Sequence, residues 1–278
     1  MDDAPRLIAT DLDGTLLRSD GTLSPRTGAV LAATEEAGIE VVFVTARPPR
    51  WLDELAAAVG GHGVAICGNG AFVYDVAARR VMSSNGFEHA VLQAIVADLR
   101  RAVPDVTFAA ERGSGLWFEA LFPHDPGHDV PHDAIQAPID RLDDEAVGKL
   151  LAKSATLQDE DFLRKASDVV GDRAQVTYSG AGGLAEINAA GVTKAVALEQ
   201  WSAGRGIGGD DVWAFGDMPN DVPMIRWAGV GWAVANAHEE VRAVADRICP
   251  SNDDDGVALT LERLLGQLDP TASLDLQS

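Results

Sequence analysis

The order of short apolar runs and helical patterns constrains the fold of this chain more than any other sequence feature. RLIATD, IEVVFVT and GVAIC have the length and residue types of buried strands. A helical pattern beginning at Ser24 and Pro25 separates the first two, and PRWLDELAAAVG predicts a helix between the last two. Strands that alternate with helices predict a parallel sheet covered on both faces. The runs AFVYD and RRVMS, joined by VAA, predict a hairpin after this block.

The same alternation returns near the end of the chain. The helical patterns there are TKAVALEQWSAG, NDVPMIRWAG, HEEVRAVA and NDDDGVALTLERLLGQL, and the strand patterns are DDVWAFGD, VGWAVANA and DRIC. Both blocks therefore fit one doubly wound α/β sheet domain, which we assign to residues 1–83 and 188–278.

Residues 84–187 differ in pattern and predict a separate α+β module inserted into the sheet domain. It would begin with the helix FEHAVLQAIVADLRRAV, followed by VTFAAERGSGLWFEALF. Two polar helical segments are expected between IQAPIDRL and QVTYSGAGGLAEIN.

Composition excludes several classes of partner. The chain has 278 residues, of which 46% are hydrophobic, so it can bury a sizeable core. Its net charge of -21 argues against nucleic acid or an anionic membrane as a partner, since both require basic patches. No apolar run approaches the length that crosses a bilayer. The sequence leaves the oligomeric state open.

Cysteine usage and the start of the chain predict a cytoplasmic protein. Cys67 and Cys249 are far apart and form no CxxC pair, which fits a reduced compartment and does not suggest zinc. The start, MDDAPRL, is acidic and lacks the layout of a secretory signal.

Two carboxylates, Asp11 and Asp13, stand at the carboxyl end of the first predicted strand. In an extended chain, residues two apart point to the same side. Two ionised carboxylates about 5 Å apart repel by roughly 3 kcal/mol at an effective dielectric of 20. A divalent cation would offset this repulsion, and oxygen ligands of this kind suit Mg²⁺. Taken alone, the pair could also be two solvated aspartates near a turn.

Other predicted strands also end in oxygen-bearing side chains. Thr45 ends VVFVT and Asp217 ends VWAFGD, while Lys194 stands at a helix start, where exposed N–H groups favour an anion. Ligands of open parallel sheets bind at the carboxyl ends of the strands. This coincidence of positions favours a functional site over isolated turn residues.

The motifs DLDGT, VTAR, GVTK and GDMPND, in this order, resemble the four motifs of the haloacid dehalogenase (HAD) superfamily of phosphatases. ICGNGAFVYD, AEINAAGVTKAVALEQ and AGVGWAVANAHEEVRAVADRICPSNDDDGVA are similar to its Cof-type branch, subclass IIB. The resemblance covers nearly all of both sheet segments. It implies a HAD-like (Rossmannoid) core, with the insert as a C2B-type cap that covers the substrate.

The resemblance implies roles for the first set of site residues. Asp11 would attack phosphorus and become an aspartyl-phosphate. Asp13 would protonate the leaving alcohol and then take a proton from the hydrolytic water. Asp217 would bind Mg²⁺ together with an Asp11 carboxylate oxygen and the main-chain carbonyl of Asp13.

The remaining site residues surround the phosphoryl group in the same comparison. Thr45 and Lys194 would hold its oxygens, and Asn220 and Asp221 would support the metal or the lysine, with Asn220 also counted among the phosphate-binding residues. Ala46 replaces the glycine that this branch usually has in VTAR, which adds a Cβ where the backbone is expected to pass close to phosphate.

These observations predict a Mg²⁺-dependent phosphatase. Its substrate would be a small phosphate monoester, a sugar phosphate or a phosphorylated cofactor, hydrolysed through the aspartyl-phosphate. One alternative is a phosphosugar mutase with the same chemistry. Another is a non-catalytic Mg²⁺-dependent phosphoacceptor or binding domain, against which Asp13 argues, because a pure receiver needs no acid/base partner.

Several residues near the predicted site and at the return from the insert have both a structural and a functional interpretation. Glu186 and Asn188 stand at the predicted return to the sheet domain, where they could contact substrate or satisfy hinge backbone groups. Asn69 and Gly70 predict a turn near the site, and Gly70 needs no catalytic role.

A His-Asp repeat with a spacing of four runs through His124, His128 and His132. On a helix this spacing would gather imidazoles for a metal. The prolines and glycine between them disfavour a helix, so a solvated cap loop is predicted, with metal or substrate contact as the alternative.

Overall fold

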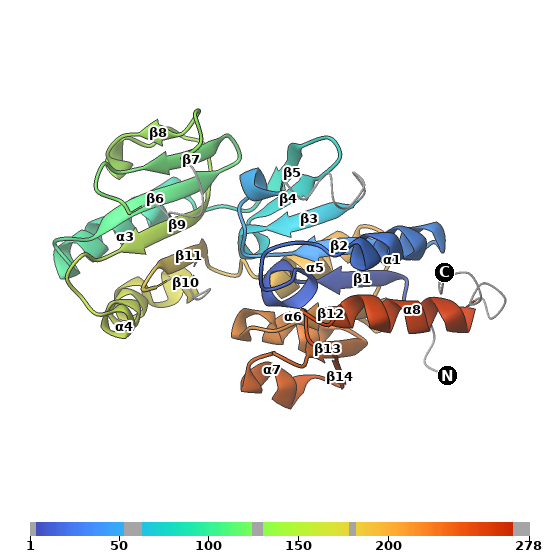
Figure 1. Ribbon diagram of the computed structural model, residues 1–278. Coiled ribbons are helices and arrows are strands. Elements are labelled where there is room, and N and C mark those ends of the chain that lie inside the picture. The colour runs from blue at the N-terminus through green and yellow to red at the C-terminus, as the bar shows by residue number, and fades with distance from the viewer. Residues whose placement is uncertain (1–3, 53–62, 124–129, 178–181, 269–278) are drawn as a thin grey trace.

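The computed structural model describes residues 4–52, 63–123, 130–177 and 182–268, and contains two β-sheets (Figure 1). The larger sheet has eight strands in the order β14-β13-β12-β1-β2-β3-β4-β5. Their bounds are β1 Leu7–Thr10, β2 Glu40–Val44, β3 Val64–Cys67, β4 Phe72–Asp75, β5 Arg80–Ser84, β12 Val212–Gly216, β13 Val230–Val234 and β14 Arg247–Cys249.

The predicted parallel sheet is confirmed. Strands β14, β13, β12, β1, β2 and β3 run parallel, and the β4–β5 hairpin adds two antiparallel strands at one edge. From β1 the chain builds outward to β2 and β3, whereas β12 leads to β13 and β14 on the other side. The strand order therefore reverses between β1 and β12, where ligands of doubly wound sheets bind.

Helices cover the sheet in two groups. Their bounds are α1 Pro25–Glu36, α5 Lys194–Ala203, α6 Val222–Trp227, α7 Glu239–Val244 and α8 Gly256–Leu268. Right-handed crossovers that run in opposite directions from a switch point place their helices on opposite faces. Accordingly α1 packs with α8, and α6 packs with both α5 and α7 (Figure 1).

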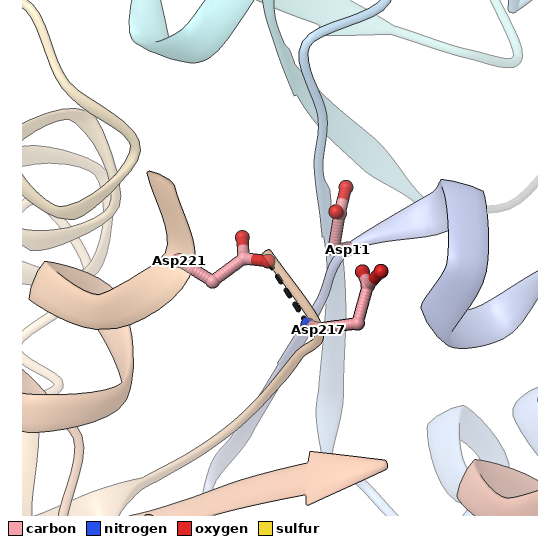
Figure 2. Close-up of side chains that lie close together, drawn as sticks. All are labelled: Asp11, Asp217 and Asp221. Atoms are coloured by element: carbon pink, nitrogen blue, oxygen red, sulfur yellow. Dashed lines mark hydrogen bonds between the residues drawn. The ribbon is translucent and has the colours of Figure 1, made fainter. Parts of the chain in front are cut away.

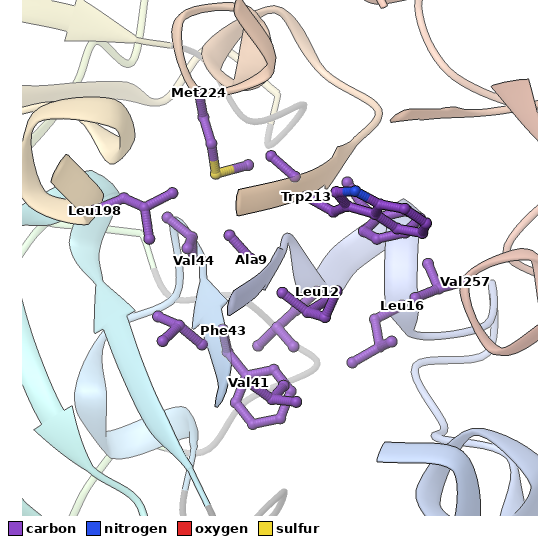
Figure 3. Packing of buried hydrophobic residues seen from close by; sticks show 14 of the residues in the cluster. Ala9, Leu12, Leu16, Val41, Phe43, Val44, Leu198, Trp213, Met224 and Val257 are labelled. Carbon is purple, nitrogen blue, oxygen red and sulfur yellow. The ribbon is translucent and has the colours of Figure 1, made fainter. Parts of the chain in front are cut away.

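The core of this sheet domain is formed by strands that are apolar on both faces. All four residues of β1 are buried, as are Val41, Val42, Phe43 and Val44 of β2. In Figure 3, Leu198 of α5 and Met224 of α6 lie on one side of the strand that carries Ala9. Burial on both faces explains why these strands read as continuous apolar runs in the sequence.

The smaller sheet has six strands in the order β10-β11-β9-β6-β7-β8. Their bounds are β6 Thr107–Arg112, β7 Gly115–Phe118, β8 Ile135–Gln136, β9 Val147–Lys153, β10 Ala174–Thr177 and β11 Ala185–Ala189. The helices α3 (His89–Ala102) and α4 (Asp159–Val170) pack together, and their apolar residues share a separate core with this sheet. We refer to this unit as the cap.

One predicted element of the cap is wrong. The first of the two polar helical segments is instead β9, which pairs with β6 on one side and β11 on the other. Its sequence, VGKLLAK, is rich in helix-forming residues. The strand forms nevertheless, because both of its edges are paired and four of its first five residues are buried against neighbours from distant parts of the chain. The cap sheet also includes Asn188 and Ala189, two residues beyond the predicted boundary.

One other predicted helix falls mainly outside the described residues. Of the helix predicted over PRWLDELAAAVG, the structure describes only residues 49–52, in which Pro49–Trp51 forms a 3-10 turn. Among the residues that the structure describes, no helix combines the length and the apolar character needed to cross a bilayer. Cys67 and Cys249 are both buried and free.

Candidate active site

Three strand ends of the large sheet deliver polar side chains to one region. Asp11 directly follows β1, Thr45 follows β2 and Asp217 follows β12. These strands are adjacent and parallel, so their carboxyl ends lie at the same edge, on both sides of the reversal in strand order.

Three buried carboxylates form the centre of this region. Figure 2 shows Asp11 and Asp217 reaching from their strand ends beside Asp221, and one carboxylate oxygen from each residue lies within 4.8 Å of the others. Lys194 Nζ lies 3.0 Å from Asp11 Oδ1 and 2.7 Å from Asp221 Oδ1, and its side chain is 1% exposed. One buried ammonium therefore faces three buried carboxylates.

Burial is the main cause that shifts the acidic groups. It raises the pKa of Asp11 well above its ordinary value, with Asp221 and Asp217 adding to the increase while Lys194 opposes it. Burial also raises the pKa of Asp217 to about 6, helped by the charge of Asp221, although Thr15 donates a 2.8 Å hydrogen bond to Asp217 Oδ1. The site thus holds more negative charge than its lysine offsets.

The start of α5 positions Lys194. Thr193 is the N-cap, and its hydroxyl accepts a hydrogen bond from Val196 N, so the helix begins at the lysine itself. Burial opposes the charged ammonium, but the carboxylates of Asp11 and Asp221 outweigh it and raise the pKa of Lys194. The two carboxylates therefore favour the charged form of Lys194.

Asp221 is held by the loop between β12 and α6. Its Oδ2 accepts hydrogen bonds from the backbone N–H groups of Asp217 and Met218 at 3.1 and 3.0 Å, and its Oδ1 accepts from Lys194. These bonds fix Asp217 and Lys194 relative to each other. Asn220 instead donates to Asn69 Oδ1 at 3.2 Å.

Asp13 has a different environment from the one that the strand pattern predicts. Strand β1 ends at Thr10, and Asp13 lies in the turn Leu12–Leu16 that follows it, so the two-residue alternation of a strand does not extend to it. Its side chain is 57% exposed and accepts two hydrogen bonds from the guanidinium of Arg47, at 2.8 and 2.6 Å. The charge of Asp13 is thus offset by Arg47, outside the three-carboxylate cluster.

Thr45 and Ala46 begin the loop after β2. Thr45 is buried, and its hydroxyl accepts a 3.0 Å hydrogen bond from Arg47 N. The carbonyl of Ala46 accepts a 2.7 Å hydrogen bond from Lys149 Nζ of the cap. The contact of Ala46 in this structure is therefore with the cap.

The residues present fit a divalent cation. Asp11 and Asp217 supply buried carboxylate oxygens whose ionised forms are disfavoured by burial and by mutual repulsion, and a hard cation relieves both costs. Gly14 leaves space beside this pair, because a Cβ there would lie 3.0 Å from Asp217 Cγ. Its φ of +75° also favours glycine.

Sequence reasoning missed Arg47 and the cap residues that contact the loop after β2. Arg47 is the last residue of the motif VTAR, so the sequence did contain a signal for it. The sequence contains no signal for Lys149 and Glu111. Each lies on a strand of the cap, and only the tertiary structure brings these strands next to the loop after β2.

Asn188 and Glu186 contact other groups of the protein. Asn188 donates to the backbone carbonyls of Gly68 and Gly148, at 2.8 and 3.2 Å, as expected of a hinge residue. Glu186 is paired with Lys149 and accepts from Asn69 Nδ2 at 3.3 Å. In the His-Asp repeat, His132 is exposed, while His124 and His128 lie outside the described residues.

Comparison with known proteins gives a consistent result. The family model described as haloacid dehalogenase-like hydrolase matches residues 8–261. A 5-amino-6-(5-phospho-D-ribitylamino)uracil phosphatase of Bacillus subtilis is 29% identical, over 91% of this chain and 93% of its own length. A pyridoxal phosphate phosphatase of Escherichia coli is 27% identical, over 91% and 96%.

Comparison with solved structures gives the same family. A crystal structure of a haloacid dehalogenase-like hydrolase from Bacteroides thetaiotaomicron superposes with a TM-score of 0.77 at 28% identity, covering 94% of this chain and 99% of that one. The match of the family model spans most of the chain, both sheet segments and the cap between them. This protein belongs to the haloacid dehalogenase-like hydrolases, in their Cof-type branch.

Proposed function

We propose that the protein is a Mg²⁺-dependent phosphatase that hydrolyses a small phosphate monoester through an aspartyl-phosphate on Asp11. The observation that carries this proposal is the position of Asp11. Its carboxylate lies at the switch point of the sheet, 3.0 Å from the ammonium of Lys194 and within the same buried cluster as Asp217. This arrangement suits a nucleophile that must meet an anionic ester.

Asp11 and Asp217, with the main-chain carbonyl of Asp13, are the groups that would hold Mg²⁺. When bound, the cation neutralises charge between the anionic nucleophile and the anionic ester. Asp221 keeps Asp217 and Lys194 in place through the hydrogen bonds described above.

The chain's own residues then perform two displacements. Asp11 Oδ attacks phosphorus while the ester P–O bond breaks, and protonated Asp13 gives its proton to the leaving alcohol oxygen. A water then attacks phosphorus, Asp13 takes its proton, and the P–O bond to Asp11 breaks to release inorganic phosphate. Lys194 and the Thr45 hydroxyl hold the transferring oxygens, and Arg47 orients Asp13.

The relatives support a phosphorylated metabolite as the substrate. Two of them are named as phosphatases of a phosphoribityl-pyrimidine and of pyridoxal phosphate, both small phosphate monoesters. We assign substrate selection to the cap, residues 84–187 by sequence and extending to Ala189 in the sheet, over a core formed by the remaining residues. We place the enzyme in the cytoplasm, consistent with its two free cysteines.

Release of inorganic phosphate from a panel of sugar, nucleotide, pyridoxal and flavin phosphates tests this function. We expect release that requires Mg²⁺, and a loss of at least about 1,000-fold in Asp11→Asn, which removes the nucleophile. Asp168→Asn, an exposed carboxylate of α4, is the matched control and should leave the rate unchanged.

Three results would contradict the proposal. Full activity of Asp11→Asn would exclude the aspartyl-phosphate, and accumulation of an isomeric sugar phosphate in place of inorganic phosphate would identify a mutase. A long-lived phosphoaspartate without turnover would identify a phosphoacceptor domain.

A further inference from the structure

The loop that follows β2 is held by the cap at two points. We call residues 45–51 the Thr45 loop. Lys149 Nζ of β9 donates a 2.7 Å hydrogen bond to the carbonyl of Ala46, and the guanidinium of Arg50 donates to both oxygens of Glu111 on β6, at 2.8 and 3.2 Å. The cap thus contacts a catalytic loop directly, with the first contact one residue from Thr45.

Lys149 belongs to a buried polar group. Its side chain and that of Glu186, each 5% exposed, form an ion pair between neighbouring strands of the cap. Glu186 also accepts from Asn69 Nδ2, and the backbone N–H of Asn69 donates to the carbonyl of Thr45 at 3.0 Å. The pair therefore contacts the Thr45 loop once directly and once through Asn69.

Stability alone does not account for an ion pair at this position. Removing two charges from water costs several kcal/mol per ion, and well-packed apolar residues of similar volume are often as stabilising or more so. An apolar pair, however, could not donate a hydrogen bond to Ala46 O. The feature specific to Lys149 is this donor, held in place by Glu186.

Within the Thr45 loop, the contact is next to the groups that react. The hydroxyl of Thr45 accepts from Arg47 N, and the Arg47 guanidinium holds Asp13 through two hydrogen bonds. Ala46 lies between them in sequence. A displacement of its carbonyl would move the phosphate-binding hydroxyl and the proton-transfer group together.

We propose that Lys149 is a positioning residue through which the cap fixes the Thr45 loop in its catalytic arrangement. The proposal rests on the phosphatase function above for its kinetic consequence. It makes the rate of the chemical step dependent on the cap for every substrate, including those too small to contact the cap.

The test compares Lys149→Met, Lys149→Arg and Lys149→Met/Glu186→Gln with the wild type. Lys153→Met removes a lysine from the same strand that does not contact the Thr45 loop and serves as the control. The first readout is amide hydrogen exchange of peptides that cover residues 45–52, in the full-length protein without substrate. The second is kcat and KM for p-nitrophenyl phosphate with Mg²⁺.

We expect faster exchange in residues 45–52 of Lys149→Met. Its kcat should fall by about 10- to 100-fold with little change in KM, because small displacements of positioned groups slow the chemical step. Lys149→Arg should recover part of kcat, since it keeps a charged donor. The double variant should remain slow because Ala46 O still lacks its partner, and Lys153→Met should match the wild type.

Three outcomes would overturn the inference. The first is unchanged hydrogen exchange and kcat in Lys149→Met, and the second is an equal effect in Lys153→Met. The third is full recovery of kcat in the double variant, which would trace the effect to the unpaired charge of Glu186. If the wild type releases no phosphate from any ester, the phosphatase proposal fails, and hydrogen exchange still decides whether Lys149 holds the loop.

Discussion

Asp11 and Asp217 are the residues whose ionisation differs most plainly from that of a solvated carboxylate. Both are buried, and each is close to Asp221 as well as to the other. Lys194 offsets part of this charge, and Thr15 stabilises only Asp217 through a hydrogen bond. The metal-free site therefore favours protons, and a divalent cation must compete with them for the same oxygens.

The stability of the metal-free protein should fall as the pH rises from about 4 to about 6 through the contribution of Asp217. Its pKa is raised from 3.8 in the unfolded chain to about 6 in the fold, so the folded state binds the proton more tightly. The stability that this provides is complete below the lower value and lost above the higher one, up to about 3 kcal/mol.

Thermal unfolding of the wild type and of Asp217→Asn in EDTA, at several pH values, measures this contribution as a difference between the two. Mg²⁺ should stabilise the wild type more at pH 7 than at pH 5, because the ion binds the deprotonated carboxylates. A Mg²⁺ effect of equal size at both pH values would show that Asp217 does not titrate in this range.

Among the elements, the contact between the turn after β3 and the start of α5 places Lys194. The 3-10 turn Gly68–Gly70 packs on the first turn of α5, directly over the N-cap Thr193. Gly70 has a φ of +110°, and a Cβ there would lie 2.8 Å from the carbonyl carbon of Thr193. The glycine thus has a steric reason.

Gly70→Ala should destabilise the fold by about 1–3 kcal/mol, from backbone strain and overpacking together. It should also lower kcat, because the displaced helix start carries Lys194. Gly38→Ala is the matched control, since Gly38 has a φ of +81° but a Cβ there would meet nothing within 4 Å.

Urea unfolding and phosphate release separate the two effects of Gly70→Ala. Gly38→Ala should lose stability through strain alone and keep its kcat. If both variants lose stability equally and both keep kcat, the position of Lys194 does not depend on the turn.

For the molecule as a whole, the cap and the sheet domain meet through close contact between strands from different sheets. Gly148 of β9 lies against the ring of Phe72 on β4, where an added Cβ would come within 2.6 Å of Phe72 Cε2. Phe72 is fully buried, so the ring has little space into which to move. Lys149 directly follows Gly148 in β9, so this contact lies next to the hydrogen bond between Lys149 and the Thr45 loop.

Gly148→Ala should therefore displace β9, lower stability by about 1–3 kcal/mol and reduce kcat for small esters. Phe72→Leu in the same chain should restore part of both losses, because the smaller side chain makes room for the Cβ. A double-mutant cycle on unfolding free energy and on kcat measures this coupling. Gly182→Ala is the control, because a Cβ at this position would have only ordinary contacts. Additive effects of Gly148→Ala and Phe72→Leu would show that the two positions are not coupled.

The sequence by itself determined the large sheet and the positions of its polar strand ends. The order of the strands, the apolar runs buried on both faces and the motifs at Asp11, Thr45, Lys194 and Asp217 are local features. They locate a site at the carboxyl edge of a parallel sheet, because that geometry follows from element order alone.

The tertiary structure alone decided the features that depend on distant partners. Strand β9 forms in a helix-prone sequence because β6 and β11 pair with both its edges. Asp13 is paired with Arg47, thirty-four residues away in the sequence. Lys149 meets Ala46 across 103 residues. No local pattern encodes such pairs, since their energies depend on burial and register that exist only after the two sheets have formed.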